Sequence, residues 1–301
     1  MPALRWRPAP VNEAAAQHLC ENLRIAPLLC QLLAQRQINT FDQARQFFRP
    51  DRSQLHDPLL MRDMARAAER LDRALQSNER ILLYGDYDVD GTTSVALMYS
   101  FLSQFTQNLD YYLPDRDKEG YGVSSAGVCY ARDHGASLVV AMDCGVKAHL
   151  AIEQAAAWGI DFIVCDHHLP GDTLPPAVAV LDPKRPDCPY PDENLSGCGV
   201  AFKLAQALAL RRNCPLEKLD EWLDLVAVSI ACDLVPMTGE NRVLMHLGLQ
   251  ALHRSPRLGL WALIERSGRR QPLTVNDVVF GLGPMINAAG RLGDAREAVR
   301  L

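Results

Sequence analysis

Short apolar runs alternate with longer amphipathic stretches through the middle of this 301-residue chain. The short runs are rich in Val, Ile and Leu, which indicates buried strands, while stretches of ten or more residues with helical spacing indicate helices. We predict strands at 81–84, 110–113, 138–142, 162–165 and 178–181, and helices between them at 92–104, 124–134 and 147–158. Apolar strands joined by helices predict an α/β fold with a parallel sheet flanked by helices on both faces.

The chain on either side of this region is predicted to be helical. Before it we predict helices at 12–23, 27–33 and 61–75, and one that starts at Phe41 after a Thr40 cap. After residue 197 we predict helices at 200–212, 216–231, 242–253, 258–267 and 295–301. The pattern divides the chain into a helical N-terminal segment (1–75), an α/β domain (76–235) and a helical connector (236–301).

The composition is that of an ordinary globular protein, with 48% hydrophobic and 22% charged residues. No apolar stretch has the length of a membrane span, and the N-terminus lacks the apolar core of a signal peptide, so we expect a cytoplasmic protein with no membrane partner. Nine irregularly spaced cysteines without a C-x-x-C pair favour reduced thiols over a zinc ribbon or disulfide framework. The net charge of -5 neither indicates nor excludes a nucleic-acid ligand, because binding depends on local patches.

Acidic and histidine residues gather where the predicted strands end. They occupy positions 86–90 after the first strand, 143 after the third and 166–168 after the fourth. Parallel sheets of this kind place their ligands in the crevice beyond the carboxyl ends of the strands. The predicted fold therefore brings these residues together at one site.

Three carboxylates stand at alternate positions in the first group, at Asp86, Asp88 and Asp90. In an extended segment the side-chain period is two, so all three are expected to face one side. Three carboxylates at close quarters repel each other unless a proton or a cation neutralises them. An EF-hand is excluded, because Leu97 stands where its loop needs Glu and a strand precedes the motif. A solvated acidic turn is the remaining alternative.

The other groups are weaker signals taken singly. Asp143 is a lone carboxylate at a strand end, where Asp also commonly caps a helix. The Asp-His-His run at 166–168 suits a metal or phosphate site, although a single His is more often packed or exposed. Asp233 closes a very apolar helix and is a candidate ligand, whereas Asp224 lies about half a turn away around that helix and is expected to be exposed. Together these residues suit a pair of Mn²⁺ or Mg²⁺ ions and hydrolysis of a phosphate ester or anhydride.

The motifs resemble those of the DHH phosphoesterase superfamily, and within it the RecJ family of single-strand-specific exonucleases. The resemblance rests on Asp-His-His with the upstream Asp-x-Asp, and on five separated motifs that occur in order. These lie at 85–94, 114–122, 166–171, 196–202 and 287–291. The resemblance covers residues 50 to 300 and implies cleavage of single-stranded DNA from the 5′ end in DNA repair and recombination.

The resemblance also implies roles for individual residues around two divalent ions. It assigns Asp86 as an acidic partner and His168 as the group that contacts the scissile phosphate and stabilises or protonates the leaving oxygen. The metal ligands that it implies are Asp88, Asp90, Asp143, His167 and Asp233.

For the DNA strand, the resemblance implies phosphate contacts from Arg116 and Arg291 and a binding role for Asn287 in the same motif as Arg291. Tyr121 is a candidate platform for base stacking, or a packed residue between its two glycines. Single-stranded DNA is the implied partner, with a helicase and a single-strand-binding protein as candidate protein partners.

Two departures from the family pattern matter. Met285 stands where an Arg is expected after Gly-Pro, which puts one phosphate contact in doubt. Members of the family also continue into a DHHA1-type lobe and an OB-like domain that have no counterpart here, so the resemblance implies a truncated chain with weakened hold on long strands.

Two alternative functions stay open. One is another DHH activity, on oligonucleotides, nucleotide bisphosphates, pyrophosphate or cyclic dinucleotides, and the other is a fragment with little turnover. Tyr84 stands where those other groups carry His, which favours the exonuclease.

Overall fold

The computed structural model describes residue 7, residues 9–292 and residues 294–301. Its residues form two compact units, Met1–Gln54 and Leu55–Leu301. The first unit holds three helices, α1 (Glu13–Leu23), α2 (Pro27–Gln35) and α3 (Phe41–Phe48). Leu19, Cys30 and Leu33 are buried between them. The predicted cap at Thr40 is present, because its side chain accepts a hydrogen bond from the main-chain amide of Gln43 at 3.2 Å.

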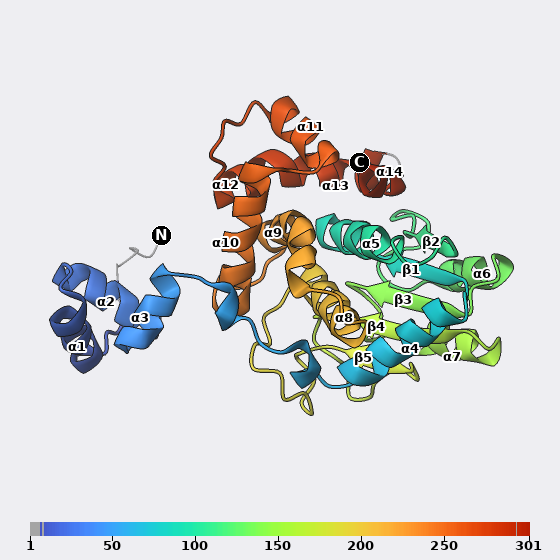
Figure 1. Cartoon of the computed structure of the whole chain (residues 1–301), viewed down its shortest axis with the longest axis horizontal. Helices are drawn as coiled ribbons and strands as arrows, with labels where there is room; N and C mark the ends of the chain where they lie inside the picture. Colours follow the sequence, from blue (N-terminus) through green and yellow to red (C-terminus); the bar gives the residue numbers. More distant parts are fainter. Residues whose placement is uncertain (1–6, 8, 293) are drawn as a thin grey trace, which may run out of the picture. The chain divides into compact units, whose positions relative to one another are not determined.

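The second unit is built on a five-stranded parallel sheet, as predicted (Figure 1). The strands run in the order β2-β1-β3-β4-β5. Every neighbouring pair is parallel. The strands are β1 (Ile81–Gly85), β2 (Leu109–Tyr112), β3 (Leu138–Met142), β4 (Asp161–Cys165) and β5 (Ala179–Leu181).

Alternate residues of the strands point into two separate apolar cores. In β1, Ile81 and Leu83 pack with helices on one face, while Leu82 and Tyr84 pack with helices on the other. The first face is covered by α4 (Met64–Gln76), α5 (Val89–Leu102), α8 (Gly197–Arg211) and α9 (Leu223–Cys232). The second face is covered by α6 (Ser125–Asp133) and α7 (His149–Ala157). Burial on both faces explains why the strands are apolar throughout.

The rest of the unit is helical. Helix α10 (Gly239–Arg254) packs along α9, and α14 (Arg296–Arg300) packs on α5. Between them lie α11 (Leu258–Ser267), α12 (Val275–Asp277), a π-helical turn (Val278–Leu282) and α13 (Gly283–Leu292). The Gly-rich stretch before the 287–291 motif is therefore helical.

Three local expectations were wrong. The predicted helix 216–231 is a 3₁₀ helix (Leu216–Trp222) followed by α9. Asp224 is buried, with 1% of its surface exposed, because the Arg257 guanidinium pairs with it at 2.8 Å. The carboxylates of the first motif do not share an extended segment, because α5 begins three residues earlier than predicted: Asp88 caps it and Asp90 lies in its first turn.

Helix α4 packs against α8 and β5, so the division between the compact units falls after Gln54 rather than near residue 75. The three-part domain division stays a prediction. All nine cysteines are free thiols. Within the described residues, none of the helices combines the length and the apolar character needed to cross a bilayer.

Candidate metal centre

Three of the predicted carboxylates meet around the imidazole of His167. His167 lies two residues after the end of β4 and is buried, and its Nε2 lies 3.1 Å from Asp143 Oδ1. The same nitrogen lies 3.6 Å from Asp90 Oδ2 and 3.6 Å from Asp233 Oδ2. The three carboxylates come from the end of β3, the first turn of α5 and the end of α9. The strand-end crevice predicted from the sequence therefore gathers side chains that are far apart along the chain.

Several buried atoms at this point have no hydrogen-bond partner. They are both ring nitrogens of His167, Oδ1 of Asp143 and Oδ2 of Asp233. Buried polar atoms are normally paired, so a cluster of unpaired ones needs an explanation such as an ion. Carboxylate oxygens with one or two imidazoles are donors that Mn²⁺ and Mg²⁺ accept. The residues present thus fit a divalent cation.

The geometry supports two overlapping ligand sets. Asp90, His167 and Asp233 offer atoms within 4.8 Å of one another, and so do Asp143, His167 and His168. His167 belongs to both sets, and because a neutral imidazole has one free lone pair, it can bind an ion in only one of them at a time. His168 also enters as a candidate ligand, which agrees with the metal or phosphate site expected at 166–168, whereas the family resemblance implied a contact with the scissile phosphate.

Asp90 is held by the start of α8. Its Oδ2 accepts from the amide of Gly197 at 2.7 Å, and its Oδ1 accepts from the amide of Cys198 at 2.8 Å and from Ser229 Oγ at 2.7 Å. Burial raises the pKa of Asp90, His167 opposes the rise, and the charge of Asp233 adds to it. The helix N-terminus and the serine favour the ionised form that a ligand must adopt.

The first motif places its other two carboxylates differently. Asp88 is half-buried, and its Oδ1 accepts from the amide of Gly91 at 3.0 Å as the cap of α5. Asp88 belongs to neither ligand set. Asp86 is buried without a hydrogen-bond partner for its carboxylate oxygens, and burial together with the charge of Asp88 raises its pKa to about 7.

Asp143 combines burial with an unusual backbone. Its φ of 60° lies in the left-handed region, which costs a non-glycine residue on the order of 1 kcal/mol. Burial, and then the charges of Asp90 and Asp88, raise the pKa of Asp143 well above its ordinary value. Strain and repulsion of this kind concentrate at functional sites.

His168 lies at the exposed edge of the centre. Its Nδ1 lies 2.8 Å from Oδ1 of Asp166, and 44% of its side chain is exposed. The hydrogen bond to Asp166 raises the pKa of His168. Burial works against ionisation of Asp166, but the bond and charge of His168 and the amide of Val146 hold the pKa of Asp166 below its ordinary value. Asp166 therefore orients the imidazole and stabilises its charged form.

The predicted DNA-binding residues flank the centre. Arg116 is exposed and its guanidinium lies 5.3 Å from the ring centroid of Tyr87. Helix α13 lies close to the same loop, since a β-carbon at Gly290 would stand 2.7 Å from the Tyr87 carbonyl oxygen. A cleft of about 450 Å³ is lined by Asn287 and Arg291 together with Cys232, the neighbour of Asp233. The 287–291 motif thus lies beside the metal centre.

Other residues of the site were not singled out from the sequence. Met285, by contrast, was singled out as a departure from the family pattern, and it packs against the apolar core. Ser229 contacts Asp90 from a helix 139 positions further along the chain, a contact that only the fold reveals. Asp182, after β5, is fully buried with an unpaired Oδ2, and burial raises its pKa to about 7. Its place at a strand end was a signal that could have identified it.

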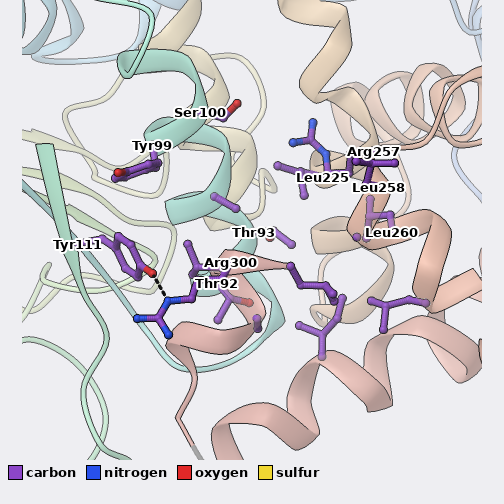
Figure 2. A pocket seen from close by; sticks show the side chains of 17 residues that line it. Thr92, Thr93, Tyr99, Ser100, Tyr111, Leu225, Arg257, Leu258, Leu260 and Arg300 are labelled. Carbon is purple, nitrogen blue, oxygen red and sulfur yellow. Dashed lines mark hydrogen bonds between the residues drawn. The ribbon is translucent and has the colours of Figure 1, made fainter. Parts of the chain in front are cut away.

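A second cleft, of about 490 Å³, lies between α5, α11 and α14 (Figure 2). Its lining is mostly apolar, and Arg300 Nε at its edge donates to the hydroxyl of Tyr111 at 3.3 Å. None of the predicted site residues lines it. It is separate from the candidate metal centre.

Residues 80–230, which contain the whole sheet and most of the candidate ligands, match the DHH family, N-terminal domain. The chain belongs to the DHH family. Membership confirms the superfamily suggested by the motifs and agrees with the crevice site at the strand ends.

Among DHH proteins, the chain is similar to RecJ. It is 40% identical over 299 residues to the single-stranded-DNA-specific exonuclease RecJ of Bacillus subtilis, covering 99% of this chain and 37% of that protein. With the RecJ of Escherichia coli it is 42% identical over 248 residues, covering 78% and 43%. The chain therefore spans about two fifths of the length of these relatives.

Solved structures show the same likeness. RecJ from Thermus thermophilus in complex with Mn²⁺ superposes with a TM-score of 0.80 at 30% identity, covering 96% of this chain and 40% of that one. An exonuclease RecJ bound to manganese gives a TM-score of 0.73 at 36% identity, covering 80% and 60%. The predicted α/β fold of the DHH type is confirmed.

Proposed function

We propose that this chain carries the catalytic centre of a metal-dependent exonuclease that hydrolyses single-stranded DNA from the 5′ end in DNA repair and recombination. The observation that carries the proposal is the convergence of Asp90, Asp143 and Asp233 on His167 Nε2, with unpaired buried atoms on three of these residues. Similarity to RecJ over 99% of the chain supports the substrate class.

Two divalent ions, Mn²⁺ or Mg²⁺, are the proposed cofactors. We assign them to Asp88, Asp90, Asp143, His167 and Asp233. Asp88 belongs to neither ligand set, but it caps the helix whose first turn holds Asp90. When bound, such ions polarise a phosphoryl oxygen and lower the pKa of water. Without them, burial and the repulsion between neighbouring carboxylates raise the pKa of Asp143.

The protein groups supply orientation and proton transfer. His168 faces the open side of the centre, and its raised pKa favours an imidazolium that can hydrogen-bond a phosphate and protonate the leaving oxygen. Asp86, with a pKa of about 7, is the proposed acidic partner that exchanges a proton near neutral pH.

The substrate strand is proposed to lie along the C-terminal helices. Residues 239–301 carry nine arginines against five carboxylates, whereas the rest of the chain carries 22 basic against 31 acidic residues. This excess of arginine, together with Arg291 in the lining of the cleft beside Asn287, suits a phosphate backbone. Arg116, whose guanidinium lies over the Tyr87 ring, is proposed to contact a further phosphate, and the exposed ring of Tyr121 offers a face to a base.

Cleavage of a 5′-phosphorylated single-stranded oligonucleotide with Mn²⁺ tests this function. Wild-type protein should release mononucleotides, and Asp143→Asn should lower the rate at least about 100-fold by removing a candidate ligand. Asp294→Asn is the matched control, because Asp294 pairs with Arg296 at the surface, and it should stay within about twofold of wild type. Faster hydrolysis of pyrophosphate or a cyclic dinucleotide than of DNA would contradict the proposal.

A helicase and a single-strand-binding protein are the proposed partners, because an enzyme of this kind needs an exposed strand. The cytoplasm is the proposed compartment, which the nine free thiols support. Adding a single-strand-binding protein to the cleavage assay tests the partnership: a faster release of nucleotides supports it, and unchanged release contradicts it.

A further inference from the structure

Tyr121 lies at the rim of the metal centre with its ring in solvent and its hydroxyl turned inward. The residue is 54% exposed, yet its hydroxyl donates to the main-chain carbonyl of Asp143 at 2.9 Å. The same hydroxyl oxygen lies 3.1 Å from Nδ1 and 3.2 Å from Nε2 of His168. One oxygen therefore contacts both the backbone of a candidate metal ligand and the imidazole that is proposed to contact the scissile phosphate.

The backbone around Tyr121 adopts an unusual conformation. Gly120 and Gly122 have φ values of 79° and 89°, in the left-handed region that glycine adopts without strain. A β-carbon at either position would meet nothing within 4 Å, so backbone conformation rather than space requires glycine. The paired glycines set the course of the chain at the point where the tyrosine hydroxyl turns to the centre.

The loop that carries Tyr121 is anchored on both sides. The hydroxyl of Tyr84 in β1 donates to the carbonyl of Gly122 at 3.0 Å. On the other side, the Tyr112 hydroxyl of β2 donates to Glu119 at 2.9 Å. Both anchors come from the sheet that holds the metal centre, so the loop fixes Tyr121 relative to that centre.

His168 has few other restraints. Asp166 holds only the Nδ1 edge of the ring, and nearly half of the side chain is exposed. The Tyr121 ring meets the His168 ring edge-on, with 5.5 Å between the centroids. The His167 ring also meets it edge-on, with 4.5 Å between the centroids, so loss of the Tyr121 hydroxyl would leave Asp166 as the only polar side chain that holds the His168 ring among the described contacts.

We propose that Tyr121 is a positioning residue whose hydroxyl fixes the His168 imidazole in the orientation that faces a phosphate bound at the metal centre. This role rests on the proposed nuclease function. It differs from base stacking, which requires the ring of Tyr121 and not its hydroxyl.

Tyr121→Phe separates the two roles because it keeps the ring and removes the hydroxyl. We expect kcat on a 5′-phosphorylated single-stranded oligonucleotide to fall about 10- to 100-fold, with KM changed less than about threefold. Tyr130→Phe is the matched control, since it removes the hydroxyl of a tyrosine in α6 that donates to Asp110 in β2 at 3.1 Å. It should keep wild-type kcat. A Tyr121→Phe variant with wild-type kcat would overturn the proposal.

A double-mutant cycle shows whether the effect passes through His168. Adding Tyr121→Phe to a His168→Ala protein should cause no further loss of kcat, because the group being positioned is already gone. An additive loss would show that Tyr121 acts by another route and would overturn the proposal.

A measurement that needs no activity separates this inference from the nuclease function. In ¹⁵N spectra of histidine side chains, Tyr121→Phe should shift the His168 ring signals and Tyr130→Phe should leave them in place. Unchanged His168 signals in Tyr121→Phe would overturn the positioning role. A wild-type protein that cleaves no phosphodiester, but whose His168 signals respond to Tyr121→Phe, would overturn the proposed function and leave the contact established.

Discussion

Gly197 and Asp143 are so close that a β-carbon at position 197 would lie 2.7 Å from Asp143 Oδ1. The amide of Gly197 also donates to Asp90 Oδ2 at 2.7 Å. The start of α8 thus contacts two candidate ligands. It donates a hydrogen bond to Asp90, and Asp143 occupies the space that a side chain at position 197 would fill. This helix terminus sets the spacing of the carboxylates around His167.

Gly197→Ala should therefore damage the metal centre. The added methyl group must displace Asp143 or the start of α8, which we expect to weaken Mn²⁺ binding about 10-fold or more and to lower the free energy of unfolding by about 1–3 kcal/mol. Isothermal titration and urea unfolding measure the two effects. Gly171→Ala is the control, because a β-carbon there meets nothing closer than 3.8 Å. Equal Mn²⁺ affinity in the two variants would contradict the assigned role of α8.

Asp224 should matter for stability and not for metal binding. Its buried carboxylate accepts from Arg257 Nε at 3.0 Å and Nη2 at 2.8 Å. Asp224→Ala leaves Arg257 without this partner. Because the arginine is partly exposed, we expect the free energy of unfolding to fall by about 2–4 kcal/mol, somewhat less than for a fully buried pair. Asp294→Ala, at a surface pair, should cost less than about 1 kcal/mol. Chemical denaturation of both variants measures the two losses of stability. Weaker Mn²⁺ binding in Asp224→Ala would contradict a purely structural role for Asp224.

Asp182 should make stability depend on pH. Its pKa of about 7 in the folded protein is raised above the value of about 3.9 for an unfolded aspartate, so the folded state binds the proton more tightly. Its contribution to stability is then fully present below about pH 4 and lost as the pH rises through 7. Asp182→Asn should unfold like wild type at pH 4 and be more stable at pH 8, by up to about 4 kcal/mol.

Urea unfolding in chelator at the two pH values measures this difference. Asp172→Asn, which changes an exposed aspartate in the connection before β5, should follow wild type at both pH values. An Asp182→Asn protein whose stability relative to wild type does not change with pH would contradict the raised pKa.

The sheet could be predicted because burial on both faces demands apolar strands, and the order of strands and helices then places residues 86–90, 143 and 166–168 at one edge. The local backbone geometry of the first motif could not be predicted from the sequence. Asp88 caps a helix through the amide of Gly91, and that choice between an extended and a helical backbone depends on the packing of α5 against α8 and α9.

Long-range contacts limited the rest of the prediction. Asp224 was expected at the surface from helix geometry alone, but its partner Arg257 lies 33 positions away. Ser229 and Gly197 reach Asp90 across more than 100 positions. The hydroxyl contact between Tyr121 and His168 depends on a loop with two left-handed glycines, whose course the apolar pattern does not encode.

Titration of Mn²⁺ into metal-free wild-type and Asp143→Asn protein shows whether His167 and Asp143 form a metal site. Wild type should bind the ion, and Asp143→Asn should bind it at least about 10-fold more weakly. The metal-free form of Asp143→Asn should unfold at a higher temperature than metal-free wild type, because a buried charge has been removed. Equal Mn²⁺ affinity in the two proteins would contradict a metal centre built around His167 and Asp143.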